Sequence, residues 1–206
     1  MPSIDDNRRH WGEEYDWSDR GEEWTPDEVW RGEILKYGMD PYLAEGMDVL
    51  EIGPGAGRWT VELLKRGAGT LVGVDLSEKC VEMCRKRFAD AGNASFRTND
   101  GRDLSFLDDA SFDFVWSFDV FVHMEADVIR AYFEGFRRLM RPGAVGVVHY
   151  PSIDRAQLEN KRQGWRGMFT SKEMVALVDD LGFELLFDHY DPDISATNSS
   201  VVIFRR

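Results

Sequence analysis

The sequence has little of what marks several large classes of protein. Its two cysteines, Cys80 and Cys84, lie four residues apart in one expected helix, which excludes a disulfide framework and provides no paired zinc motif. We expect both to be buried or half-buried thiols and expect no metal site. No apolar run approaches the 18 residues of a membrane helix, and no leader-like segment opens the chain. These absences predict a cytoplasmic protein without a membrane partner.

Positive charge is scarce as well. The 206 residues include 25 lysines and arginines against 38 aspartates and glutamates, a formal net charge of -13. Proteins that bind nucleic acid usually present a basic face, and the longest basic run here is only Arg85–Arg87. We therefore expect no nucleic-acid partner. The length suffices for one domain with a sizeable core, and it leaves monomer and homodimer equally open.

Residues 1–30 differ from the rest of the chain and are treated as an N-terminal aromatic and acidic cap segment. Aliphatic residues are rare there, while large rings are frequent: Trp11, Tyr15, Trp17, Trp24 and Trp30. Such rings need a surface to cover. They either pack on the outside of the main core or form a lid over a pocket. Near the end of this segment, Thr25 followed by Pro26 predicts a helix with Thr25 as its N-cap.

From residue 48 onward, apolar strand patterns alternate with amphipathic helix patterns. The expected strands are 48–53, 70–77, 94–100, 112–119, 141–151, 183–191 and 199–206, with helices at 59–67, 77–92, 125–140 and 170–183. Alternation predicts an α/β, doubly wound, seven-stranded and mostly parallel sheet, with 112–119 near its centre. No helix separates the last two strands, so one antiparallel strand should lie near the edge. Residues 31–206 then form one domain, with an insertion at about 150–168.

The stretch VLEIGPGAGRWT, residues 49–60, places a glycine loop between a strand and a helix, where a ligand can approach the backbone closely. A pyrophosphate is disfavoured, because Pro54 lacks an N–H and Glu51 adds negative charge. A phosphate-binding Gly-Lys-Ser/Thr sequence is missing. Asp75 and Asp100 end the next two strands, and an acid at the first of these positions commonly binds ribose hydroxyls. The loop therefore predicts a cationic, phosphate-free ligand that carries a ribose.

Five segments in order resemble the motifs of class I S-adenosylmethionine-dependent methyltransferases of the small-molecule type: VLEIGPGAGRWT, LVGVDLSEKCVEMCRKR, FRTNDGRDLSF, FDFVWSFDVFVHM and LMRPGAVGVVHY. The resemblance covers about residues 30–206. It implies a Rossmann-like methyltransferase fold, S-adenosylmethionine as cofactor and S-adenosylhomocysteine as its product.

The resemblance also implies a role for each matching position. Glu51 would lie near the amino and sulfonium end of the cofactor, Asp75 would bind both ribose hydroxyls, and Asp100 would accept from the adenine amino group. Arg58 could contact the methionine carboxylate. The full set implied for the cofactor is Glu51, Gly53, Pro54, Gly55, Gly57, Arg58, Asp75, Leu76, Ser77, Asp100, Gly101, Arg102, Ser117 and Phe118.

Candidates for catalysis follow the fourth and fifth strands. His123 matches the place where many small-molecule members carry a histidine, and it is either a general base or a structural residue. Asp119 could pair with a cationic amine or hold its turn. Of His149 and Tyr150, which alternation directs to opposite faces, we expect Tyr150 on the ligand side. Residues expected at the acceptor are Trp11, Tyr15, Trp17, Tyr37, Trp165 and Arg166.

The expected reaction is O- or N-methylation of a small molecule, such as a natural product or a sugar, by in-line methyl transfer. A non-catalytic S-adenosylmethionine-binding module that regulates a partner is the alternative. An NAD-dependent oxidoreductase is less favoured, since Glu51 and Pro54 oppose a pyrophosphate and no Tyr-x-x-x-Lys sequence stands in the chain. The absence of an Asn-Pro-Pro-Tyr-type sequence argues against nucleic-acid amine methylation.

Overall fold

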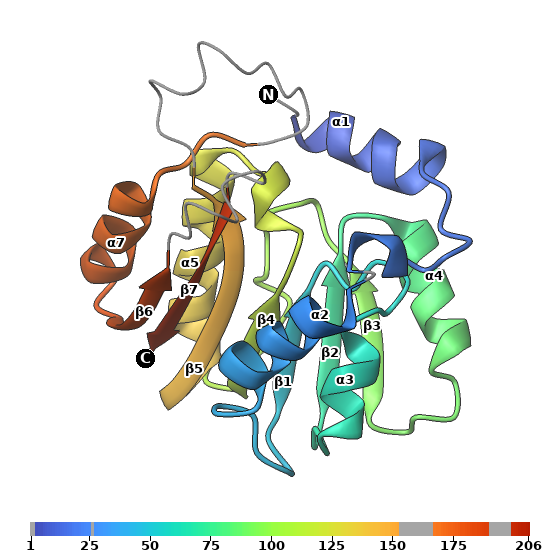
Figure 1. The fold of residues 1–206 in the computed structure, drawn as a ribbon, viewed down its shortest axis with the longest axis horizontal. Coiled ribbons are helices and arrows are strands. Elements are labelled where there is room, and N and C mark those ends of the chain that lie inside the picture. Colours follow the sequence, from blue (N-terminus) through green and yellow to red (C-terminus); the bar gives the residue numbers. More distant parts are fainter. Residues whose placement is uncertain (1–2, 26, 153–166, 190–198) are drawn as a thin grey trace.

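A computed structural model describes residues 3–25, 27–152, 167–189 and 199–206. Its centre is one seven-stranded sheet, flanked by helices (Figure 1). The strands are β1 (Val49–Ile52), β2 (Leu71–Asp75), β3 (Ala94–Thr98), β4 (Phe112–Ser117), β5 (Met140–Pro151), β6 (Glu184–His189) and β7 (Ser199–Arg205). All seven strands expected from the apolar patterns are present.

The strand order is β3-β2-β1-β4-β5-β7-β6. The pairs from β3 through β5 are parallel, whereas β7 runs antiparallel to both β5 and β6. The prediction of a mostly parallel sheet with one reversed strand near the edge is confirmed, as is the central place of β4. Strand order reverses between β1 and β4, which is where ligands of such sheets bind.

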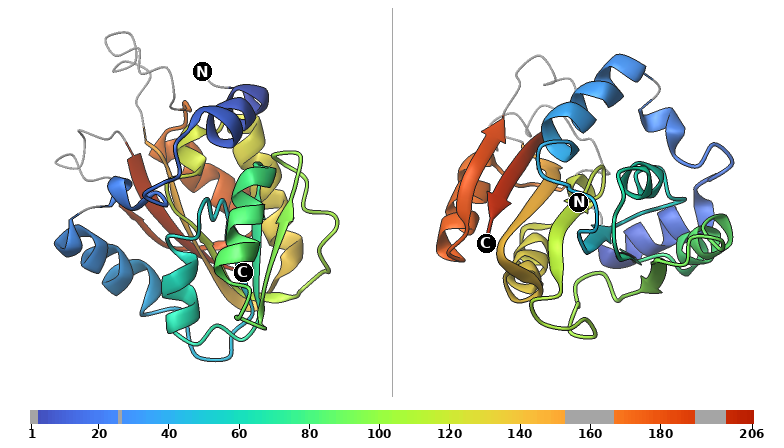
Figure 2. Two further views of the ribbon diagram at one scale, coloured as in Figure 1. Left: turned by 90° about the vertical axis from the view of Figure 1, so that its right-hand side faces the viewer. Right: turned by 90° about the horizontal axis from the view of Figure 1, so that it is seen from below.

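Alternate residues of the strands fill two separate cores. Leu50, Val115 and Val148 pack with α5 (Ala126–Leu139) and α7 (Ser171–Asp180) on one face. Val49 and Trp116 pack on the other face with α3 (Thr60–Lys65) and α4 (Glu78–Arg87). Figure 2 shows these helices on opposite sides of the sheet. Both faces are buried, which is why β4 reads as a continuous apolar run.

The cap segment forms its own short helices: α1 (Ile4–Arg9), the π-helical turn η1 (His10–Glu14) and the 3-10 turn η2 (Glu22–Trp24). Next come α2 (Glu28–Ile34) and the turn η3 (Leu35–Met39). The predicted N-cap of α2 was wrong by two residues. The Asp27 carboxylate accepts the Val29 and Trp30 N–H groups, while the Thr25 hydroxyl accepts a hydrogen bond from Arg58.

The carboxyl ends of the parallel strands form one edge of the sheet, and α1 lies across it (Figure 1). The 3-10 turn η4 (Phe121–His123) leaves the same edge between β4 and α5. Among the described residues, no helix is both long enough and apolar enough to span a membrane.

Candidate functional site

The glycine loop is a tight left-handed turn between β1 and α3. Gly53, Gly55 and Gly57 have φ values of +69°, +56° and +85°, a region that side chains other than glycine rarely adopt. The Gly53 N–H donates to the Val74 carbonyl at 2.8 Å, which ties the loop to β2. The loop therefore exposes backbone at the point where strand order reverses.

Asp75 lies beside this loop at the end of β2. Its carboxylate accepts the Gly55 N–H at 3.0 Å and the Ser77 N–H at 2.8 Å. Burial raises the pKa of Asp75, and the N–H groups of Ser77, Gly55 and Leu76 counteract that rise. A carboxylate has about four acceptor sites, so lone pairs remain for ligand hydroxyl groups.

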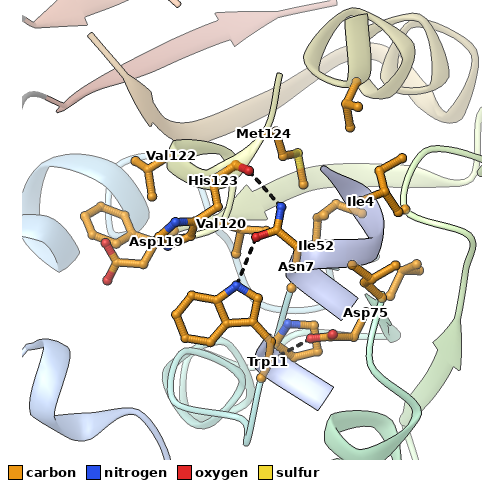
Figure 3. A pocket seen from close by; sticks show the side chains of 18 of the residues that line it. Ile4, Asn7, Trp11, Ile52, Asp75, Asp119, Val120, Val122, His123 and Met124 are labelled. Carbon is orange, nitrogen blue, oxygen red and sulfur yellow. Dashed lines mark hydrogen bonds between the residues drawn. The ribbon is translucent and has the colours of Figure 1, made fainter. Parts of the chain in front are cut away.

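The cap segment covers this edge of the sheet. A Cβ built on Gly55 would lie 2.8 Å from the Trp17 ring, and one on Gly101 would lie 2.8 Å from Ile4. Under the same segment, the Trp11 indole donates to the Asn7 side chain at 3.3 Å, and Asn7 donates to the His123 carbonyl at 2.8 Å (Figure 3). Three aromatic or polar side chains of the cap segment, those of Asn7, Trp11 and Trp17, thus lie over the strand ends.

A cavity of about 400 Å³ lies between the cap segment and the loops, within the usual size range of small-molecule sites. Several residues expected at the cofactor line it, from both sides of the β1–β4 crevice: Gly53, Pro54, Gly55, Arg58, Asp75, Leu76, Gly101, Arg102 and Phe118. So do His123, Asp119, Trp11 and Trp17. Predicted residues from five separate segments are therefore brought together.

Other predicted residues do not line the cavity: Glu51, Gly57, Ser77, Asp100 and Ser117. Ser77 is the N-cap of α4, and the Ser117 hydroxyl donates to the Ile52 carbonyl. The exposed Asp100 carboxylate accepts the N–H groups of Arg102 and Asp103. The side chains of Ser77, Ser117 and Asp100 therefore stabilise the loops around the cavity through hydrogen bonds to backbone groups.

Glu51 is buried beneath the glycine loop, where the Thr60 hydroxyl donates to it at 2.6 Å. Burial raises the pKa of Glu51 to about 8; the Thr60 hydrogen bond opposes this rise and the charge of Asp75 adds to it. Burial thus favours the protonated form of this carboxyl. A cation in the cavity would favour its ionised form.

Asp119 finds its partners within the protein. Its carboxylate pairs with Arg58 at 2.6 Å and with His149 Nδ1 at 3.1 Å. Burial alone would raise the pKa of Asp119, but the hydrogen bonds and charges of His149 and Arg58 outweigh it and hold the pKa well below its usual range. Such a carboxylate is a poor base and already has a cationic partner, which favours the structural one of the two roles considered for Asp119.

The expectation that Tyr150 faces the ligand was wrong. Its ring is fully buried in the core formed with α5 and α7, and its hydroxyl donates to Asp188 at 2.5 Å. His149 takes the opposite side, stacked on Phe118 with 4.4 Å between ring centroids. The β5 register places His149, not Tyr150, beside Asp119.

The predicted acceptor residues separate into three groups. Trp11 and Trp17 line the cavity, and Tyr15 packs against both rings with centroid distances of 5.0 and 4.7 Å. Tyr37 is 56% exposed and lies next to Lys36 outside the cavity, so its predicted place at the acceptor was wrong. Trp165 and Arg166, with most of the insertion expected at 150–168, lie outside the described residues.

Some lining residues had not been predicted, including Ile4, Asn7, Trp24, Val120 and Met124. Ser3 and Asp6 form a capping box at the start of α1. Their spacing was the available signal for a helix that carries Ile4 and Asn7. Cys80 and Cys84 are free and buried as expected, and the described part of the chain has no metal-binding group of three His, Cys, Asp or Glu side chains.

These residues fit S-adenosylmethionine. The left-handed glycine turn admits a ligand close to the backbone, and the partly satisfied Asp75 carboxylate suits ribose hydroxyl groups. The buried Glu51 beneath the loop suits a cation. Gly53, Gly55, Asp75, Leu76 and Gly101 would hold the cofactor, which supplies an electrophilic methyl group on a sulfonium.

Comparisons with known proteins agree with this fit. Residues 49–143 match the family model described as a methyltransferase domain. Demethylmenaquinone methyltransferase of Staphylococcus aureus is 34% identical over 89 residues, which are 42% of this chain and 35% of that protein. An O-methyltransferase of Aspergillus sclerotiorum is 23% identical over 180 residues, covering 82% of this chain and 67% of its own length. The first of these matches therefore spans only about a third of the relative.

A solved structure of geranyl diphosphate methyltransferase, in complex with GPP and sinefungin, shares the fold with a TM-score of 0.76. The match covers 100% of this chain and 99% of that one at 14% identity. The segment that matches the family model, residues 49–143, contains the glycine loop, Asp75 and strands β1 to β4. Residues 49–143 thus match a methyltransferase domain, and the chain has the Rossmann-like fold of class I S-adenosylmethionine-dependent methyltransferases.

Proposed function

We propose that this protein transfers the methyl group of S-adenosylmethionine to a small-molecule acceptor. The observation that carries the proposal is the cavity of about 400 Å³ that the cap segment shares with the glycine loop and Asp75. The glycine loop forms one part of the cavity wall, and Trp11, Trp17 and His123 form another. Such an enclosed, aromatic site suits a small acceptor better than a protein or nucleic-acid surface.

The acceptor that fits best is uncharged where it meets the methyl donor. Asp119 is neutralised by Arg58, and Arg102 pairs with Asp127 at 3.0 Å at the rim of the cavity. Val120, Val122 and Met124 form an apolar part of the same wall. A neutral molecule with a hydroxyl group, such as a natural product, suits this lining. The relatives of this protein include O-methyltransferases.

Methyl transfer to such an acceptor depends mainly on position. The nucleophile has to lie about 3 Å from the methyl carbon and in line with the sulfur. A hydroxyl also has to lose a proton, for which a nearby general base helps. We assign this role to His123, whose ring lies 5.0 Å from that of Trp11 at the cavity wall. The cap segment, residues 1–30, would then close the acceptor site.

The test is transfer of an isotopically labelled methyl group to a panel of phenols, aliphatic alcohols and amines. Labelled product from a neutral hydroxyl compound, with S-adenosylhomocysteine formed in equal amount, would support the proposal. Tight S-adenosylhomocysteine binding without turnover on any acceptor would instead favour the non-catalytic binding module. Stabilisation by NAD but not by S-adenosylhomocysteine would contradict the cofactor assignment.

A further inference from the structure

One buried guanidinium joins the glycine loop, the cap segment and the end of β4. Arg58 directly follows Gly57 and is only 6% exposed. Its Nη1 donates to the Gly21 carbonyl at 3.1 Å and to the Thr25 hydroxyl at 2.6 Å. Its Nη2 donates to the Asp119 carboxylate at 2.6 Å. Both terminal nitrogens are therefore used within the protein, which does not favour the expected contact of Arg58 with a methionine carboxylate.

Asp119, in turn, is held firmly on the body of the domain. It has a left-handed φ of +62°, and both its backbone N–H and its carboxylate lie 3.1 Å from His149 Nδ1 on β5. In the described part of the chain it makes no hydrogen bond or ion pair with the cap segment. The bonded connection of Asp119 to the cap segment therefore runs through Arg58.

The contacts of Arg58 differ in kind from those of Asn7 and Lys79, and they lie near a second charged link, the ion pair of the half-buried Arg31 with Glu22 of the cap segment. Asn7 donates to the His123 carbonyl, and the exposed Lys79 donates to the Tyr15 carbonyl at 3.2 Å. Only Arg58, among these three, combines full charge with burial. Hydrogen bonds from a charged donor are the stronger ones, and a buried charge deprived of its partner is strongly unfavourable.

We propose that Arg58 is a positioning residue that holds the cap segment closed, and that its ion pair with Asp119 controls how long the cofactor stays bound. Trp17 and Ile4 cover the glycine loop and Gly101, so a ligand in the cavity leaves only when this segment lifts. Arg58 has to release Gly21 and Thr25 when it does. This inference rests on the cofactor part of the proposed function and is independent of the acceptor.

Trypsin reports the lifting directly, because Arg20 is exposed and adjacent to the held Gly21 carbonyl. Cleavage after Arg20 is followed without ligand, from the mass of the fragment 1–20. When reclosing is fast, the rate follows the open population. Thr25→Val keeps the shape of the side chain and removes one hydrogen bond to a charged group, so cleavage should become about tenfold faster. Thr25→Ser keeps the hydroxyl and should restore the wild-type rate.

The second readout is the dissociation rate of S-adenosylhomocysteine, measured by displacement. Thr25→Val should raise it by the same factor as the cleavage rate, because both events need the open state. Asp119→Asn should accelerate both as well, although Asp119 does not bond to the cap segment. Arg58→Lys, which keeps the charge but not the forked donors, provides an independent variant if one of these does not fold.

Ser111→Ala is the matched control. This hydroxyl donates to the Asp108 carbonyl before β4, at the opposite edge of the sheet, and both rates should stay at wild-type values. Unchanged rates in Thr25→Val and Asp119→Asn would overturn the inference, and so would faster cleavage with an unchanged dissociation rate. Failure of wild-type protein to bind S-adenosylhomocysteine would contradict the cofactor assignment, while the ligand-free cleavage rates would still test Arg58.

Discussion

The Trp17 indole lies directly on the backbone of Gly55, so that a Cβ at residue 55 would lie 2.8 Å from two of its ring atoms. The two residues are 38 positions apart, and one belongs to the cap segment while the other belongs to the glycine loop. Their contact places an aromatic ring against the most conformationally restricted part of the site. It also makes that part of the loop sensitive to a single methyl group.

Gly55→Ala should weaken S-adenosylhomocysteine binding at least tenfold. The φ of +56° costs a side-chain-bearing residue roughly 1–2 kcal/mol, and the new methyl would displace Trp17. Isothermal titration with S-adenosylhomocysteine measures the loss. Gly92→Ala is the matched control, since a Cβ there meets no atom within 4 Å. Equal affinity of the two variants would show that the loop does not carry the ligand.

Glu51→Gln should change how stability depends on pH. Burial raises the pKa of Glu51 from 4.5 to about 8. Between these two values the unfolded chain releases a proton that the folded protein retains, so wild-type stability falls as pH rises. Glutamine does not titrate. The free energy of unfolding of the variant, relative to wild type, should therefore rise across this window and stay flat below and above it.

Urea unfolding at pH 4, 6, 8 and 9 measures the difference, with about 1.4 kcal/mol expected per pKa unit. The exposed Glu134→Gln serves as control and should shift the free energy by less than roughly 0.5 kcal/mol at every pH. A parallel offset between wild type and Glu51→Gln at all four pH values would contradict a raised pKa.

His123→Ala should lower the methylation rate of a hydroxyl acceptor by about 10²-fold or more, because the acceptor then lacks a general base. An amine that arrives neutral needs no such base and should lose less. Single-turnover rates with both acceptor types, at saturating S-adenosylmethionine, separate the two. Near-normal turnover on the hydroxyl acceptor would make His123 a structural residue of the turn η4.

Tyr150→Phe should destabilise the protein without affecting catalysis. The hydroxyl bonds to Asp188 at 2.5 Å and to Ser171 at 3.0 Å, and its loss leaves the half-buried Asp188 carboxylate with one donor fewer. We expect a loss of about 1–3 kcal/mol in the free energy of unfolding. Tyr37→Phe, at an exposed ring, should change it by less than roughly 0.5 kcal/mol. A large fall in kcat for Tyr150→Phe would return Tyr150 to the ligand side.

The strand pattern, the reversed strand and the glycine loop were predictable because each depends on local signals. Short apolar runs marked the strands, and the missing helix between β6 and β7 marked their antiparallel pairing. Pro54 and Glu51 argued against a phosphate at the loop, and Asp75 at the end of the second strand indicated a ribose. Thr25 illustrates the limit of such signals, since Thr-Pro-Asp offers two N-cap candidates and the local pattern favoured the wrong one.

The sequence by itself determined the domain class, because hydrophobic periodicity and turn residues act over a few positions. Only the tertiary structure decided which of His149 and Tyr150 lies on the side of Asp119. Both faces of β5 are buried, so alternation places the two side chains on opposite faces without showing which face is which. The tertiary structure also decided that Arg58 bonds to Thr25 and Asp119. Those partners lie 33 and 61 residues away. Packing of the glycine loop against the end of β4 brings the buried charge to its counter-charge, and packing of the cap segment against that loop brings Thr25 to Arg58.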